Sequence, residues 1–223
     1  MTTPLNIGIA GLGNVGASVF RLLQQNAAML AARAGRPLKV TAVSARDKTR
    51  DRGIDTAGVT WHDDPVALAS DPAVDLVVEL MGGAEGKAFD LVAAAVKVGK
   101  PVVTANKALL ASRGAEVLAL LKNAKSSIAF EAAVAGGIPV IKGLREGLSA
   151  NNIRAIYGIL NGTCNYILSE MTHTGRDFAD VLIEAQQLGY AEADPTFDVD
   201  GIDAGHKLSI LTGLAFGCVP DVK

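Results

Sequence analysis

Acidic side chains gather in a loop near the end of the chain, and a single lysine follows them. The loop begins at Gly189, and the acidic residues in it and in the first turn of the helix that follows are Glu192, Asp194, Asp198, Asp200 and Asp203. Asp203 and Lys207 are four residues apart, so they share one face of a helix predicted over 201–216. Carboxylates so placed can hold a substrate ammonium, and the lysine can transfer a proton. The spacing also fits a negatively charged helix start with one surface ion pair, so the residues alone leave both interpretations open.

A glycine-rich turn near the start of the chain has the pattern that holds the pyrophosphate of a dinucleotide. It reads Gly11-Leu12-Gly13-Asn14-Val15-Gly16 and lies between an apolar run and an amphipathic segment. In this pattern the first glycine permits a tight turn, the second lets the backbone approach the pyrophosphate, and the third lets the helix pack closely on the strand. The helix N-terminus adds free N–H groups and a positive dipole end. All six residues are therefore predicted to bind a nicotinamide cofactor.

The residues after the second apolar run bear on the choice of cofactor. A site that prefers NAD usually has an acidic residue there to bind the ribose 2′-hydroxyl, but the run ends in Ser44-Ala45-Arg46. Arg46 can pair with a 2′-phosphate through its planar guanidinium. This favours NADP and leaves NAD open, because Arg46 also fits a solvated loop with other charges nearby.

Two further loops are expected at the carboxyl ends of strands, where ligands bind in sheets of this kind. One contains Met81-Gly82-Gly83, and the other ends with Asn106-Lys107. We therefore predict that Gly83 and Lys107 face the cofactor crevice. A lysine at a helix start that points to water is the simpler alternative for Lys107.

These residues need elements that bring them together, and the first part of the chain has an alternating pattern. Strands are predicted over 6–11, 38–44, 75–80, 101–104 and 127–131, and helices over 14–33, 89–98 and 109–122. Strands that alternate with helices at this spacing form a parallel sheet with right-handed crossovers. The predicted fold class is therefore α/β, with an N-terminal Rossmann-type doubly wound parallel sheet.

The pattern changes near residue 140, where we place a domain boundary. Residues 1–139 form the predicted dinucleotide-binding domain, and residues 140–223 form a substrate-binding catalytic domain. The second part has helices predicted over 140–148, 163–173, 178–188 and 201–216, with an alternating strand over 152–160. Helices with a further strand indicate an α+β domain.

Composition narrows the class of partner. Lys and Arg total 21 against 23 for Asp and Glu, so no basic surface is expected to attract nucleic acid. The apolar stretches are broken well short of the ~20 residues that a membrane span needs. The first residues lack the regions of a signal peptide, and Cys164 and Cys218 have no spacing for a disulfide framework or a zinc site. We expect a cytoplasmic protein that acts on small molecules.

Six motifs together resemble homoserine dehydrogenase over nearly the whole chain. They are ELMGG at 79–83, TANK at 104–107, EAAVAGGIP at 131–139, NGTCNYI at 161–167, LGYAEADP at 188–195 and DVDGIDAGHKL at 198–208. The resemblance implies reversible reduction of L-aspartate 4-semialdehyde to L-homoserine by NAD(P)H, in threonine, methionine and isoleucine biosynthesis. It also implies a homodimer formed through the second domain.

The resemblance further implies roles for single residues. Lys207 matches the catalytic proton donor, Glu192 and Asp203 match substrate ligands with Asp198 a weaker candidate, and Lys107 and Gly189 match cofactor contacts. It also implies a monovalent cation such as Na⁺, held by the backbone carbonyls of Glu131, Val134, Gly136 and Ile138. Carbonyl oxygens are suitable ligands for a hard cation.

The chain departs from the family pattern in its length, and two other functions also fit its residues. Members of the family continue well past residue 223, so we expect a fragment whose second domain is incomplete and whose activity is open. The nearest alternative enzyme is a phosphate-dependent semialdehyde dehydrogenase with Cys164 as its nucleophile, which needs an activating partner for the thiol. The other alternative is a non-catalytic dinucleotide-binding regulatory module.

Overall fold

A six-stranded sheet forms the first half of the protein. The computed structural model describes residues 2–222. All strand pairs in the sheet are parallel, in the order β3-β2-β1-β4-β5-β6. The strands are β1 (Leu5–Ala10), β2 (Leu38–Ser44), β3 (Thr60–Trp61), β4 (Leu76–Glu79), β5 (Val102–Thr104) and β6 (Ile128–Ala129). The strand order reverses between β1 and β4, and ligands bind at such a switch point.

Helices cover both faces of this sheet, as expected for strands that are apolar throughout. They are α1 (Asn14–Gln25), α2 (Ala27–Ala34), α3 (Ala67–Ser70), α4 (Lys87–Lys97) and α5 (Lys107–Lys122). Side chains alternate between two cores: Val78 packs with Phe20 of α1 on one face, whereas Val77 packs with Leu91 of α4 and Leu109 of α5 on the other. The predicted Rossmann-type α/β fold is therefore confirmed.

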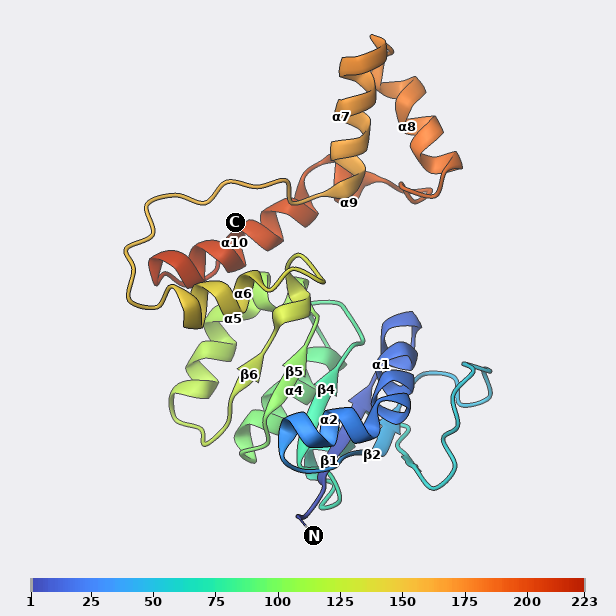
Figure 1. Cartoon of the computed structure of the whole chain (residues 1–223), viewed down its shortest axis with the longest axis vertical. Helices are drawn as coiled ribbons and strands as arrows, with labels where there is room; N and C mark the ends of the chain where they lie inside the picture. The colour runs from blue at the N-terminus through green and yellow to red at the C-terminus, as the bar shows by residue number, and fades with distance from the viewer. Residues whose placement is uncertain (1, 223) are drawn as a thin grey trace.

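The chain after the sheet forms helices, turns and connecting loops in the described part. A 3₁₀ turn (Glu131–Ala133) leads to α6 (Val140–Lys142) and one π-helical turn (Gly143–Gly147), followed by α7 (Gly162–Thr174), α8 (Phe178–Gln187), α9 (Thr196–Val199) and α10 (Ile202–Phe216). Ile210 and Leu211 attach α10 to the large core of the sheet. The α7–α8 hairpin extends away from the sheet and has a small core of its own, formed by Ile167, Val181, Ala185 and Ala191 (Figure 1).

The strand predicted over 152–160 is wrong. This segment has no regular secondary structure and forms a long connection between the π-helical turn and α7 (Figure 1). No strand among residues 2–222 pairs with this segment, and a strand without a partner has no inter-strand hydrogen bonds to hold it. Tyr157 and Ile159 are consequently 93% and 76% exposed.

Smaller differences concern the ends of elements. The helix predicted over 14–33 is two helices that meet at Asn26, and the strand predicted over 127–131 is reduced to Ile128–Ala129. The two-residue β3 was not predicted, because it is too short to show a period. No helix in the described part of the chain is long and apolar enough to cross a membrane.

Candidate active site and cofactor cavity

The glycine-rich turn joins β1 to α1, and the surroundings of each of its three glycines show why a side chain is absent there. Gly11 has a φ of +93°, and a Cβ there would lie 2.5 Å from the carbonyl oxygen of Leu80. A Cβ on Gly16 would lie 1.8 Å from the carbonyl oxygen of Gly11. A Cβ on Gly13 would meet nothing within 4 Å. Packing therefore requires the first and third glycines, whereas the second leaves open space for a ligand.

A cavity of about 930 Å³ opens beside this turn. Of the predicted cofactor residues it is lined by Gly11, Leu12, Gly13 and Arg46. A smaller cavity of about 380 Å³ shares Gly13 with it and reaches Asn14. The larger volume suits a cofactor-sized ligand, so the chain's own residues fit a dinucleotide at this place. Val15 and Gly16 lie in the first turn of α1 behind Gly13.

The loop after β2 is fastened to the glycine-rich turn and leaves two arginines free. The Arg52 guanidinium donates to the carbonyl oxygens of Leu12 at 2.9 Å and Arg50 at 2.7 Å. Asp47 accepts hydrogen bonds from Thr49, chiefly from its side chain, and these lower the pKa of the Asp47 carboxyl. Arg46 and Arg50 line the cavity and are exposed, and neither guanidinium has a hydrogen-bond or ion-pair partner within residues 2–222.

A fully buried carboxylate, Glu79, organises the loops at the ends of β4 and β5. Its Oε1 accepts hydrogen bonds from the backbone N–H groups of Met81 at 2.8 Å and Gly82 at 3.3 Å, and its Oε2 accepts from the Thr104 hydroxyl at 2.6 Å. Glu79 is 0% exposed, so these three donors take the place of water around the carboxylate.

Asn106 continues this network to the start of α5. Its backbone N–H donates to Thr104 Oγ1 at 2.9 Å, and its Nδ2 donates to the carbonyl oxygen of Gly83 at 2.7 Å. Its Oδ1 accepts from the N–H of Leu109 and so caps the helix. Through these bonds the loop that contains Gly83 fixes Lys107, the first residue of α5.

We expect Glu79→Ala to lower the free energy of unfolding by about 3 kcal/mol or more. The substitution leaves the buried Thr104 hydroxyl and the part-buried N–H groups of Met81 and Gly82 without their acceptor, and each orphaned buried group costs about 1–3 kcal/mol. Urea denaturation of the parent and the variant measures the change. Glu85→Ala is the control, because Glu85 carries an exposed ion pair with Arg113 and its loss should change stability little. Equal effects of the two substitutions would contradict the role given to Glu79.

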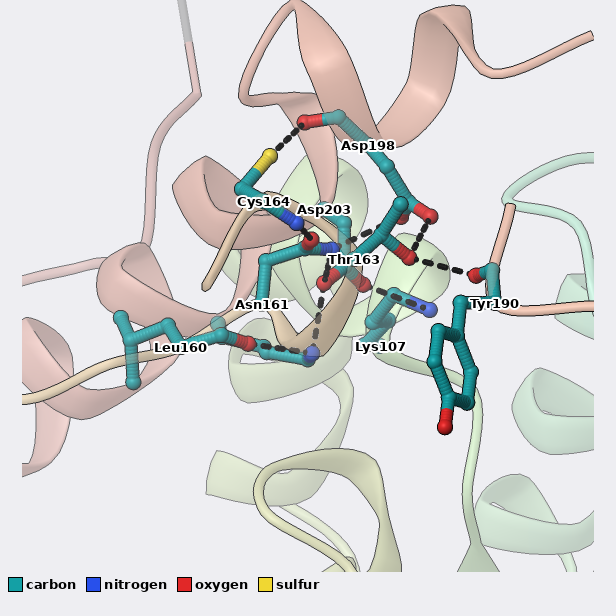
Figure 2. Close-up of polar contacts among 9 residues, drawn as sticks. Lys107, Leu160, Asn161, Thr163, Cys164, Tyr190, Asp198 and Asp203 are labelled. Carbon is teal, nitrogen blue, oxygen red and sulfur yellow. Dashed lines mark hydrogen bonds and ion pairs between the residues drawn. The ribbon is translucent and has the colours of Figure 1, made fainter. Parts of the chain in front are cut away.

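Asp203 joins two lysines from different halves of the chain. Its Oδ2 lies 2.5 Å from Lys207 Nζ on the same helix, and its Oδ1 lies 3.2 Å from Lys107 Nζ at the start of α5 (Figure 2). Lys207 also donates to the carbonyl oxygen of Leu160 at 2.6 Å. The side chains of Asp203 and Lys207 are only 8% and 20% exposed, so this is a largely buried pair.

The charge state of Asp203 follows from these neighbours. Burial by itself raises the pKa of the Asp203 carboxyl, but hydrogen bonds from Lys207, Asn161 and Lys107 outweigh burial and hold this pKa below its usual range. The carboxyl is therefore ionised at neutral pH. A surface ion pair, one of the two interpretations that the spacing left open, does not describe this buried cluster.

Asp198 belongs to the same cluster, and each of its carboxylate oxygens has a side-chain hydrogen-bond donor from the first turn of α7 or its cap. Its Oδ1 accepts from Asn161 Nδ2 at 2.7 Å. The Thr163 hydroxyl lies 2.8 Å from both Asp198 Oδ2 and the carbonyl oxygen of Tyr190, and its single hydrogen can serve one of them at a time. Asp198 thus ties α9 to the first turn of α7 (Figure 2).

The surroundings of Cys164 oppose a role as nucleophile. Burial raises the pKa of the thiol, and the carboxylates of Asp198 and Asp203 raise it further. The thiol also lies 3.1 Å from the carbonyl oxygen of Asp198, to which it donates. A reactive cysteine needs a lowered pKa and an electropositive neighbourhood. Cys164 has a raised pKa and two carboxylates nearby.

Glu192 and Gly189 lie in the loop after α8, outside the hydrogen-bonded cluster. Glu192 is exposed, and its carbonyl oxygen accepts from Gln186 Nε2 at 3.1 Å. Gly189 has a φ of +76°, a conformation that favours glycine and turns the loop. The structure therefore does not bring the Glu192 carboxylate into contact with Asp203 or Lys207.

The segment with the four carbonyls of the predicted cation site is a tight loop before α6. The Glu131 carboxylate accepts the N–H groups of Ile141 and Lys142 at 3.0 and 2.9 Å. The Ile138 carbonyl accepts the N–H of Val140 at 2.8 Å. Val134 is buried and Gly136 is exposed. Ala135, with a φ of +49°, is the one non-glycine residue of the described part with positive φ, so the loop holds an unfavourable conformation.

Sequence reasoning gave no role to Asn161, Thr163 or Glu79. Asn161 and Thr163 lie in the motif NGTCNYI and Glu79 begins ELMGG, but the residue types alone indicate no role for these side chains. An asparagine directly before a helix is a capping signal, and Asn161 does cap α7 by accepting the N–H of Cys164. That signal finds the cap but not the two carboxylates that the same side chain binds.

Comparison with known proteins identifies both parts of the chain. The family model described as "Homoserine dehydrogenase, NAD binding domain" matches residues 11–131, and the one described as "Homoserine dehydrogenase" matches residues 139–223. The homoserine dehydrogenase of Pseudomonas aeruginosa is 54% identical over 214 residues, which are 96% of this chain and 49% of that protein. That of Neisseria gonorrhoeae is 51% identical over the same shares. The chain spans about half the length of the curated relatives it matches.

Solved structures give the same result. The crystal structure of a homoserine dehydrogenase from Thiobacillus denitrificans has a TM-score of 0.89 and 50% identity, covering 96% of this chain and 49% of that one. A hyperthermophilic archaeal homoserine dehydrogenase in complex with NADPH has a TM-score of 0.83 and 27% identity, covering 98% of this chain and 72% of that one. By sequence and by fold, the chain belongs to the homoserine dehydrogenase family.

Proposed function

We propose that this chain is the cofactor-binding and catalytic part of a homoserine dehydrogenase, with residues 1–139 binding the cofactor and residues 140–223 the substrate. The reaction is reversible reduction of L-aspartate 4-semialdehyde to L-homoserine with NAD(P)H. One observation carries the proposal: the carboxylate of Asp203 pairs with Lys107 from the sheet half and with Lys207 from the helical half. This ion-pair cluster therefore joins the half of the chain that holds the cofactor cavity to the half that carries Lys207, as the proposal requires.

The proposed mechanism needs one proton donor beside the cofactor. The reduced nicotinamide supplies the hydride, which leaves negative charge on the former aldehyde oxygen. Lys207 is placed to protonate that oxygen: an ammonium has three hydrogens, and Asp203 and Leu160 accept two of them. Asp203 holds the Lys207 side chain in place by accepting one of its hydrogens, and Lys107 and the turn at Gly189 are proposed to contact the cofactor near the reacting carbon.

Carboxylates of the second half are proposed to hold the ammonium group of the substrate. Glu192 is the main candidate because it is exposed and has no partner for its carboxylate in the described part of the chain. Asp203 is a second ligand and Asp198 a weaker one, since protein donors already occupy their oxygens.

NADP is the proposed cofactor, on the strength of the free Arg46 at the rim of the cavity. Replacing Arg46 with Ala should weaken NADPH binding by about 1.5–3 kcal/mol, the range for a charge-assisted contact, and leave NADH binding nearly unchanged. Fluorescence titration with each cofactor measures both affinities. An equal loss for the two cofactors would show that Arg46 does not bind the 2′-phosphate.

A monovalent cation such as Na⁺ is proposed at the carbonyls of Glu131, Val134, Gly136 and Ile138. The strained turn at Ala135 supports this, because such conformations are kept where the surroundings require them. The Ile138 carbonyl has one lone pair left after its bond to Val140. A cytoplasmic homodimer is the proposed state of the enzyme.

An assay of NADPH oxidation with aspartate 4-semialdehyde, without phosphate, tests the proposed function. Turnover supports it. Reduction of NADP⁺ with the same semialdehyde that depends on phosphate and is lost in Cys164→Ser would support the acylating semialdehyde dehydrogenase instead. Cofactor binding without turnover, in the complete natural protein, would support the regulatory module.

A further inference from the structure

We propose that Asn161 is a positioning residue of the active site, whose side-chain amide fixes the Asp203 carboxylate and, through it, the Lys207 ammonium. This inference rests on the proposed function, because it assigns Asn161 a part in the same proton transfer. Asn161 lies at the N-cap of α7 and is only 8% exposed.

Three of the four hydrogen-bonding positions of the Asn161 amide are used, including both N–H donors. Its Oδ1 accepts the N–H of Cys164 at 2.8 Å, and its Nδ2 donates to Asp198 Oδ1 at 2.7 Å and to Asp203 Oδ2 at 2.9 Å (Figure 2). The orientation of the amide follows from these partners. Turning it over would place its oxygen against two carboxylate oxygens and its NH₂ against a backbone N–H.

These bonds give Asn161 control over Asp203. Asp203 Oδ2 lies between two donors, Lys207 Nζ and Asn161 Nδ2, while Oδ1 faces Lys107. Without the neutral donor, the position of the buried carboxylate depends on two lysines alone, and these belong to helices from different halves of the chain. The amide also separates the carboxylates of Asp198 and Asp203, which otherwise repel each other.

Lys207 is held by the same short segment of chain. The carbonyl oxygen of Leu160 and the Asp203 carboxylate are the acceptors of its ammonium, and Asn161 is the next residue after Leu160. A shift of Asn161 therefore moves both acceptors. Misplacement of a reacting group by about 1 Å can reduce the rate about 10²-fold.

The helix cap and the proposed positioning role can be separated by the choice of variant. Serine is as good an N-cap as asparagine but has no NH₂ group, so Asn161→Ser keeps the cap and removes the donors to both carboxylates. Asn161→Asp also keeps the cap but places a third carboxylate beside Asp198 and Asp203. Asn165→Ser is the matched control, since Asn165 is exposed on the same helix and its side chain has no bonding partner in the described part.

In the complete natural protein, Asn161→Ser should lower kcat about 10²-fold with NADPH affinity within threefold of the parent. The melting temperatures of Asn161→Ser and Asn165→Ser should agree within a few degrees. Asn161→Asp should lose more at pH 8 and recover toward the parent as the pH falls to 6, because protonation of the introduced carboxyl restores a donor. Its neighbours Asp198, Asp203, Lys207, Lys107, Cys164 and His206 are present in the parent too, so the ratio of variant to parent activity isolates the new group.

A second measurement does not depend on turnover. Carboxyl ¹³C NMR should show a higher pKa for Asp203 in Asn161→Ser than in the parent and no change in Asn165→Ser. An Asp203 pKa unaffected by Asn161→Ser, or a kcat within threefold of the parent, would overturn the proposal. If the parent itself fails to reduce aspartate 4-semialdehyde, the proposed function fails, and the NMR titration still decides whether Asn161 controls Asp203.

Discussion

Replacing Lys207 with Ala is expected to lower kcat by about 10²–10⁴-fold, the usual contribution of a general acid. NADPH affinity should stay within a few-fold, because the cofactor cavity is lined by residues of the sheet half. The expected cause is the loss of the only proton donor that the proposed mechanism places at the developing alkoxide. Steady-state kinetics in the complete natural protein measures kcat and KM separately.

Lys207→Arg distinguishes proton transfer from simple ion pairing. Arginine keeps the positive charge beside Asp203 but holds its proton too tightly to act as an acid near neutral pH. This variant should therefore stay folded and still lose most of the activity. Lys207→Ala alone is less decisive, since removal of one partner of a buried pair can also destabilise the fold.

A contrasting result is expected for Glu192→Ala. An exposed carboxylate that binds only the substrate ammonium should mainly raise KM when it is removed, with a smaller effect on kcat. If Lys207→Ala and Lys207→Arg both keep kcat within threefold of the parent, Lys207 is not the proton donor. The buried cluster would then have a structural role.

The parts of the fold that were predictable depend on local signals. The glycine-rich turn and the apolar strands β1, β2 and β4 each carry their own pattern, and tight packing at Gly11 and Gly16 gives that pattern a physical cause. The segment 152–160 also has a strand pattern, but alternation of apolar and polar residues shows only that a strand formed there would be amphipathic. Whether a partner strand exists is not a local property, and this prediction failed for that reason.

The site was predictable only where its contacts are local. The Asp203–Lys207 pair spans four residues and follows from helical spacing. The contact of Asn161 with Asp203 spans 42 residues, that of Glu79 with Thr104 spans 25, and Lys107 meets Asp203 across the two halves. Such contacts follow from how α7, α10 and the sheet pack together, so residue types alone could not give them.

The glycine-rich turn supports a second large expected effect, with opposite outcomes at two of its glycines. Gly16→Ala should lower the free energy of unfolding by about 2–4 kcal/mol, as severe overpacking does. Its new methyl group would lie 1.8 Å from the carbonyl oxygen of Gly11, and no side-chain rotation can relieve a contact between two backbone-fixed groups. The turn must then open, and NADPH affinity should fall at least about 10²-fold with it.

Gly13→Ala should give the reverse combination. A Cβ at Gly13 meets nothing within 4 Å, so the variant should fold with nearly parental stability. Gly13 lines both cavities beside the turn, however, and the methyl group would occupy the space where the backbone approaches the pyrophosphate. Urea denaturation and NADPH titration of the two variants separate these outcomes. Parental NADPH affinity in Gly13→Ala would place the pyrophosphate elsewhere, and parental stability in Gly16→Ala would contradict the close packing of α1 on β1.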